Sequence, residues 1–153
     1  MKFICDDNLG KLAKWLRTLG YDTLFSRTIS DSQLLSKALN EDRVILTRDT
    51  KLVELKVASK YLLIESDKPL EQLKQVKKEF NLETSEEKLF TRCLVCNTPL
   101  NSIEKEKIKD KAPPYVYETQ ENFVFCSKCN KIFWSGTHVQ KMTERLKESQ
   151  IIA

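Results

Sequence analysis

The first 82 residues alternate between short apolar runs and stretches with helical periodicity. The apolar runs lie at residues 3–5, 23–25, 44–47 and 61–64. In the stretches that follow them, apolar residues, mostly leucine, recur every three or four positions, over residues 9–19, 31–39, 52–58 and 69–80, as expected of helices that bury one face. Strands that alternate with helices form parallel sheets covered by helices on both faces. This order predicts an α/β domain with a parallel sheet of about four strands.

Three local signals mark the ends of these helices. Gly20 follows the first helix and is expected to cap its C-terminus. Residues 30–33, Ser-Asp-Ser-Gln, have the form of a capping box. Pro69 suits the first position of the fourth helix.

The alternation stops after Asn81. A charged stretch over residues 83–88 is interpreted as a linker, which predicts two domains, residues 1–88 and 89–153. In the second domain, the aromatic runs at 115–117 and 123–125 are predicted strands, an apolar run at 132–134 follows the second cysteine pair, and 139–147 is a predicted helix. A domain of about 65 residues buries only about 60% of its unfolded surface. This one has few aliphatic residues, so a structural metal is expected to stabilise it.

Four of the five cysteines have the spacing of a metal site: Cys93, Cys96, Cys126 and Cys129. Two Cys-x-x-Cys knuckles aim four sulfurs at one tetrahedral ion and leave no open position for a substrate water. The spacing predicts a structural zinc ribbon in a small β-rich domain. A single iron held by the same sulfurs and a thioredoxin-like redox pair are the alternatives.

Acidic residues follow the predicted strands: Asp6 and Asp7 the first, Asp49 the third and Asp67 the fourth, while Asp31 opens the second helix. Ligands of open parallel sheets bind beyond the carboxyl ends of the strands. Carboxylates gathered there repel one another unless a cation neutralises them. Magnesium or manganese is the expected cation, because both prefer oxygen ligands. The alternative is local, since aspartate after a strand is also a common helix N-cap.

Basic residues near these acids are candidate contacts for a nucleic-acid backbone. Arg48 precedes Asp49, and Lys11, Lys14 and Arg17 lie on the polar side of the first predicted helix, which can equally be a solvated face. The net charge is 26 − 22 = +4. Four zinc-bound thiolates lower it to about +2, so charge permits an RNA or DNA partner without demanding one. No apolar run reaches the roughly 18 residues of a membrane span, and a soluble, cytoplasmic protein is expected.

Several of these motifs together resemble the Mut-seven C-terminal RNase family. In the first half they are residues 5–17, 19–22, 30–35 and 46–49, and in the second half residues 92–97, 113–117 and 134–138. The resemblance runs from about residue 2 to residue 142. It implies a PIN-like, three-layer nuclease domain fused to a zinc ribbon, acting on RNA with a divalent metal.

The resemblance also implies roles for particular residues. The family's acids fall on Asp6, Asp31 and Asp49, and its zinc ligands fall on the four cysteines. The polar residue that orients the first acid falls on Asn8. Asp67 is added from its place after a strand alone.

Three functions follow from these patterns. The first is a ribonuclease that hydrolyses RNA phosphodiester bonds through a divalent metal held by the aspartates. The second is a non-catalytic RNA- or ribosome-binding protein in which the ribbon makes the contacts. The third is a phosphoryl receiver domain, which would need a fifth strand that ends in a lysine.

Overall fold

Four parallel strands form the larger sheet of the computed structural model, which describes residues 1–54 and 60–153. The strands are β1 (Lys2–Cys5), β2 (Asp22–Phe25), β3 (Val44–Thr47) and β4 (Tyr61–Leu63), in the spatial order β2-β1-β3-β4. The α/β prediction with a four-stranded parallel sheet is confirmed. The described residues add no fifth strand to this sheet, which argues against a receiver domain.

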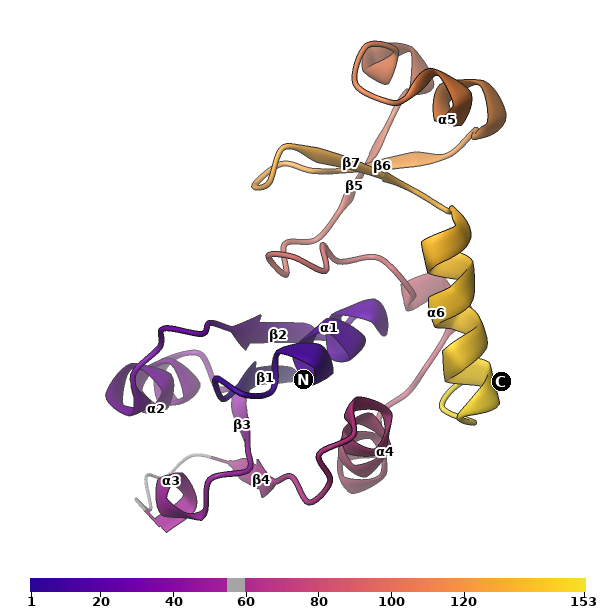
Figure 1. Ribbon diagram of the computed structural model, residues 1–153. Coiled ribbons are helices and arrows are strands. Elements are labelled where there is room, and N and C mark those ends of the chain that lie inside the picture. Colours follow the sequence, from indigo (N-terminus) through magenta and orange to yellow (C-terminus); the bar gives the residue numbers. More distant parts are fainter. Residues whose placement is uncertain (55–59) are drawn as a thin grey trace. The chain divides into compact units, whose positions relative to one another are not determined.

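Helices cover both faces of this sheet (Figure 1). They are α1 (Gly10–Thr18), α2 (Asp31–Asn40), α3 (Thr50–Glu54) and α4 (Pro69–Phe80). Neighbouring residues of a strand point to opposite faces. Ile4 accordingly packs with Leu34 of α2 and Leu52 of α3, whereas the Phe3 ring meets the rings of Tyr21 and Phe80 on the other face. Leu55, Val57 and Ala58, predicted to continue the third helix, lie outside the described residues.

The predicted helix ends are confirmed. The Ser30 hydroxyl accepts a hydrogen bond from the Gln33 amide, and the Gln33 side chain accepts one from the Ser30 amide. Pro69 lies in the first turn of α4. Gly20 has a φ of +93°, and a Cβ there would lie 2.7 Å from the Lys88 carbonyl oxygen, so this position requires glycine.

The chain divides into two units, Met1–Asn97 and Thr98–Ala153. The boundary predicted between residues 88 and 89 falls earlier than this division, because the segment after it is bonded to the sheet and helices of the first unit. For example, the Phe90 amide donates to the Thr18 carbonyl at 2.9 Å. The predicted linker contains a short 3₁₀ helix, η1 (Glu86–Lys88).

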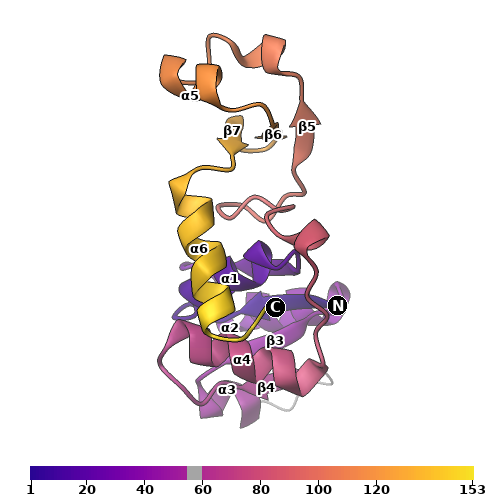
Figure 2. The same cartoon turned by 90° about the vertical axis from the view of Figure 1, so that its right-hand side faces the viewer.

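The second unit contains a three-stranded antiparallel sheet (Figure 2). Its strands are β5 (Asn101–Ile103), β6 (Phe123–Cys126) and β7 (Lys131–Trp134), and its helices are η2 (Lys105–Ile108), α5 (Pro114–Thr119) and α6 (Thr137–Glu148). Ile108 and Phe123 form the buried centre of one face of the sheet, where Ile103, Val116 and Trp134 pack around them.

The predicted strand at residues 115–117 is wrong, since these residues belong to α5. Pro114 occupies the first turn, where its fixed φ favours a helix, and the Tyr117 amide donates to the Pro113 carbonyl at 2.9 Å. The other predicted elements of this unit are confirmed, and α6 starts two residues earlier than predicted. Among the described residues, no helix combines the length and apolar character needed to cross a membrane.

Candidate functional site

The four cysteines of the two knuckles form one cluster. Their Sγ atoms all lie within 4.8 Å of one another. A zinc ion with bonds of about 2.3 Å to four tetrahedral sulfurs sets the sulfurs about 3.8 Å apart, so a small contraction suffices to bind it. No disulfide joins the cysteines among the described residues. The cluster fits a zinc ribbon and argues against a separate thioredoxin-like pair.

An asparagine with a left-handed backbone follows each cysteine pair. Asn97 has a φ of 75° and Asn130 a φ of 54°, a conformation that asparagine adopts more readily than most residues. In the first knuckle, the Asn97 amide donates to the Cys93 carbonyl at 2.8 Å. In the second, the Cys129 amide donates to the Cys126 Sγ at 3.3 Å. Both turns are therefore closed locally, a feature that the cysteine spacing alone does not predict.

Arg17 was predicted on the polar side of its helix, and this prediction is wrong. The residue is 5% exposed. Its Nε donates to the Thr23 carbonyl at 2.9 Å, and its Nη1 donates to the Leu94 and Val95 carbonyls at 3.0 and 3.3 Å. Burial lowers the pKa of Arg17 below its usual value. The guanidinium is therefore committed to the protein interior and not to a bound RNA.

Asp22 extends this set of contacts along the same side of the sheet. Its Oδ1 accepts from Arg43 Nη1 at 2.8 Å and from Asn97 Nδ2 at 2.7 Å. Burial raises the pKa of the Asp22 carboxyl, but the hydrogen bonds from Arg43 and Asn97 and the charges of Arg43 and Arg92 outweigh it. The pKa of Asp22 therefore lies below its usual value.

We expect the charge of Asp22 to stabilise the fold at neutral pH. Because the folded pKa is lowered, this contribution is present above the unfolded pKa of about 3.9 and is lost as the pH falls through the folded pKa. Urea unfolding of the wild type and of Asp22→Asn, at several pH values between 7 and 3, checks this. The difference in unfolding free energy should persist to about pH 4 and shrink below it. A difference that already disappears between pH 7 and 5 contradicts the assignment.

Asp6 lies at the carboxyl end of β1, as predicted, and is 9% exposed. Its Oδ2 accepts a hydrogen bond from the Thr47 hydroxyl at 2.8 Å, and its Oδ1 accepts one from the Asp7 amide at 2.8 Å. Thr47, fully buried at the end of β3, also accepts from the Asp49 amide at 3.0 Å. Asn8, expected to orient the first acid, is exposed. Thr47 takes that place, and it joins the ends of β1 and β3.

The other predicted acids lie in exposed positions. Asp49 caps α3, because its Oδ1 accepts from the Lys51 amide at 2.9 Å. Asp31 does not cap α2, since Ser30 takes that position. Near Asp67, the turn is held by Ser66, whose Oγ accepts from the Lys68 amide.

Of the residues described, only the four cysteines gather three or more potential metal ligands around one point. The predicted aspartates do not form such a group.

Three of the predicted basic residues are exposed. Lys11 and Lys14 lie three residues apart on α1, which begins soon after Asp6, and Arg48 lies between Thr47 and Asp49. These side chains can reach a ligand in solvent, in contrast to Arg17.

Comparison with known proteins gives two matches. A family model described as the Mut7-C RNase domain matches residues 1–146 of this chain. The human protein named exonuclease mut-7 homolog is 33% identical to it over 101 residues, which cover 63% of this chain and 12% of the human protein. The chain thus corresponds to a small part of that relative's length. No solved structure matches it.

Proposed function

This chain belongs to the Mut7-C RNase domain family, and we propose that it hydrolyses RNA phosphodiester bonds at the edge of its parallel sheet, near Asp6. The observation that carries this proposal is the bridge made by Thr47. It holds the buried carboxylate of Asp6 and the backbone of Asp49 at one point, where two neighbouring strands end. Ligands bind at this edge in open parallel sheets.

We propose that magnesium or manganese acts there, with Asp6, Asp31 and Asp49 as its ligands. The donors suit such an ion, because all three offer oxygen, and the side chains of Asp31 and Asp49 are exposed. When bound, the ion would polarise the scissile phosphate and lower the pKa of the attacking water. We propose that the domain is PIN-like both in its layer order and in its mechanism. Asp67 would be a peripheral member of the site.

The exposed cations would bind the substrate backbone. Lys11, Lys14 and Arg48 are available to phosphate oxygens, and contacts of this kind position a nucleic acid without reading its sequence. RNA is therefore the proposed partner.

The proposal is tested by incubating purified protein with end-labelled single-stranded RNA. Cleavage should appear with added magnesium or manganese and disappear when EDTA removes them. Because zinc binds four thiolates much more tightly than magnesium binds carboxylates, a brief EDTA treatment with measured zinc content separates the two metals. Cleavage that is equal with and without the divalent ions would contradict the metal-dependent mechanism.

A second candidate is a non-catalytic RNA-binding protein. It is favoured by one observation: the carboxylates of Asp6, Asp31, Asp49 and Asp67 do not gather into a metal-binding group. In that case RNA binding would persist without cleavage in any divalent ion, and it would be insensitive to Asp49→Asn.

We expect Thr47→Val to lower the cleavage rate about tenfold or more and to destabilise the protein. Valine has nearly the same shape but leaves the Asp6 carboxylate and the Asp49 amide without their shared partner. An unsatisfied buried group of this kind costs about 1–3 kcal/mol. The turnover number should fall more than the Michaelis constant changes, because the hydroxyl contacts the acids and not the RNA. Thr47→Ser, which keeps the hydroxyl, is the control and should recover most of the rate.

A further inference from the structure

The outer edge of β2 is closed by side chains and not by another strand. β2 is an edge strand of the four-stranded sheet and, among the described strands, pairs only with β1. On the other side, the Thr23 amide donates to Asn97 Oδ1 at 2.9 Å, and the Thr23 carbonyl accepts from Arg17 Nε at 2.9 Å. Exposed strand edges are usually covered in some way. Here the cover is the residue that follows the first cysteine pair, together with an arginine of α1.

Arg17 joins this edge to the first knuckle itself. Its Nη1 donates to the carbonyls of Leu94 and Val95, the two residues between Cys93 and Cys96. These carbonyls face the guanidinium only while the turn keeps its closed shape. Arg17 is almost completely buried, so it would lose acceptors that water cannot readily replace if the turn opened.

Asn97 extends the connection to the centre of the sheet. Its Nδ2 donates to Asp22 Oδ1 at 2.7 Å, and the same oxygen accepts from Arg43 Nη1, which also donates to the Phe3 carbonyl of β1 at 3.1 Å. Arg92 supports the same turn, since it donates to the Gly20 and Asn97 carbonyls at 3.2 and 3.0 Å. The knuckle is thus bonded to α1, β2 and, through Arg43, β1.

We infer that Arg17 and Asn97 are positioning residues for the zinc site, which couple metal binding in the first knuckle to the closed edge of β2. Zinc holds Cys93 and Cys96 in the turn, and the turn holds the partners of Arg17 and Thr23. The coupling is reciprocal, because contacts that raise the affinity for zinc must themselves be strengthened by zinc to the same degree. A zinc ion with four thiolates also carries a net charge of −2, which the guanidinium of Arg17 partly offsets. This coupling does not depend on nuclease activity.

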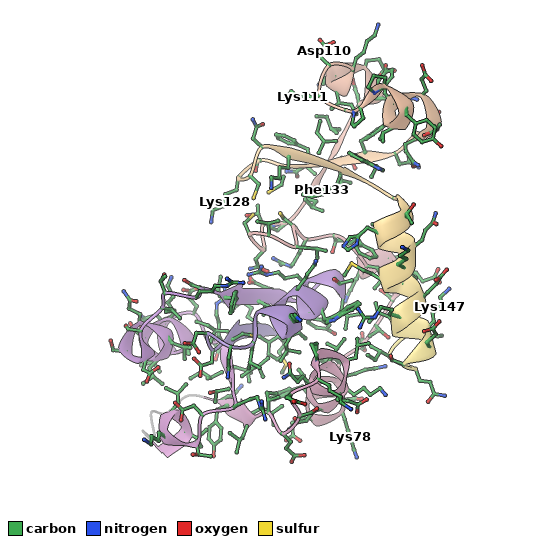
Figure 3. All side chains as sticks on the ribbon, in the orientation of Figure 1. Lys78, Asp110, Lys111, Lys128, Phe133 and Lys147 are labelled. Carbon is green, nitrogen blue, oxygen red and sulfur yellow. The ribbon has the colours of Figure 1, made fainter. Side chains whose placement is uncertain are left out.

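The second knuckle provides a matched control. Asn130 occupies the position equivalent to Asn97 and shares its left-handed backbone, but its side chain is exposed. The turn that precedes it is also open to solvent, and Lys128 extends outward from the end of the β6–β7 hairpin (Figure 3). Glycine tolerates a positive φ, so replacing either asparagine by glycine removes the side chain without straining the backbone.

The first experiment measures metal affinity. Zinc competition with a coloured chelator, and cobalt binding followed by its thiolate absorption bands, give the affinity of each variant. Asn97→Gly and Arg17→Met should each bind zinc about 10–100-fold more weakly than the wild type, the loss typical of residues that orient metal ligands. Asn130→Gly should change the affinity less than threefold. Equal losses in Asn97→Gly and Asn130→Gly would overturn the inference, because they would show a purely local effect of the asparagine.

The second experiment runs in the opposite direction and needs no variant that could fail to fold. Amide hydrogen exchange of the wild-type protein is measured by NMR with and without zinc. The Thr23 amide should exchange about 10–100-fold faster after zinc removal. The Asp6 amide, which donates to the Leu46 carbonyl inside the sheet, should change much less. If Thr23 keeps its protection while the zinc-free second unit unfolds, the first knuckle is not coupled to β2 and the inference fails.

Discussion

Removal of zinc is expected to unfold the sheet β5–β6–β7. The second unit has a small core, in which Ile108, Ala112 and Phe123 are the buried centre of the cluster against this sheet. Binding of zinc to four thiolates is worth about 10–16 kcal/mol of coupled folding and binding free energy in small domains at neutral pH, which exceeds what such a core supplies. Among the described residues, no disulfide joins the four cysteines of the two knuckles. A disulfide therefore cannot hold the knuckles together when the metal is removed.

The measurement is the amide spectrum of β6 and β7 during titration with a strong chelator, with the bound metal determined by elemental analysis. Cys126→Ser should reproduce the loss of these signals without a chelator. Cys5→Ala is the matched control: Cys5 is fully buried in β1, and burial raises the pKa of its thiol, so this variant should keep one metal per chain. A ribbon that stays folded without metal would contradict a structural role for the metal. Iron found in the purified protein would identify iron, and not zinc, as the metal that the four cysteines bind.

The fold of the first unit could be predicted because its signals are local and agree with one another. The apolar runs, the capping box at Ser30 and the glycine at position 20 each specify one element, and the order of the elements then selects a parallel sheet. The prediction of a strand at residues 115–117 is wrong because the local signals there disagree with one another. Aromatic residues favour strands, but the two prolines before Tyr115 start a helix, and this turn chemistry outweighs the propensity of three residues.

The contacts of the site could be predicted only in part. The spacing of the cysteines and the place of Asp6 after a strand are sequence features, and both appear in the structure. The roles of Thr47, Arg17 and Asn97 depend on residues far apart in the chain, such as the bonds between Arg17 and Leu94. Helical periodicity places Arg17 on the polar face of its helix, but it does not predict that this residue is buried against residues almost 80 positions away. Pairing of this kind needs the tertiary structure.

Asp6→Asn is expected to lower RNA cleavage by about 10²–10³-fold. This substitution removes the charge of the buried carboxylate at the centre of the proposed site while keeping its shape. Electrostatic stabilisation by a bound metal is worth several kcal/mol in a transition state, and each 1.36 kcal/mol is a factor of ten in rate. Asn keeps one oxygen that can accept from the Thr47 hydroxyl but loses the acceptor of the Asp7 amide, which lies at an exposed residue, so the unfolding free energy should fall by only about 1 kcal/mol.

Asp42→Asn is the matched control for charge. Asp42 is exposed and has a φ of 53°, which asparagine also tolerates, and it precedes β3 at the opposite end from Thr47. Both variants should bind zinc as the wild type does, because neither contacts the cysteines. Loss of cleavage in Asp6→Asn alone, with RNA binding retained, assigns the chemistry to the sheet edge. Equal cleavage by all three proteins would instead mean that a contaminating nuclease or another site is responsible, and it would leave RNA binding as the function that the fold supports.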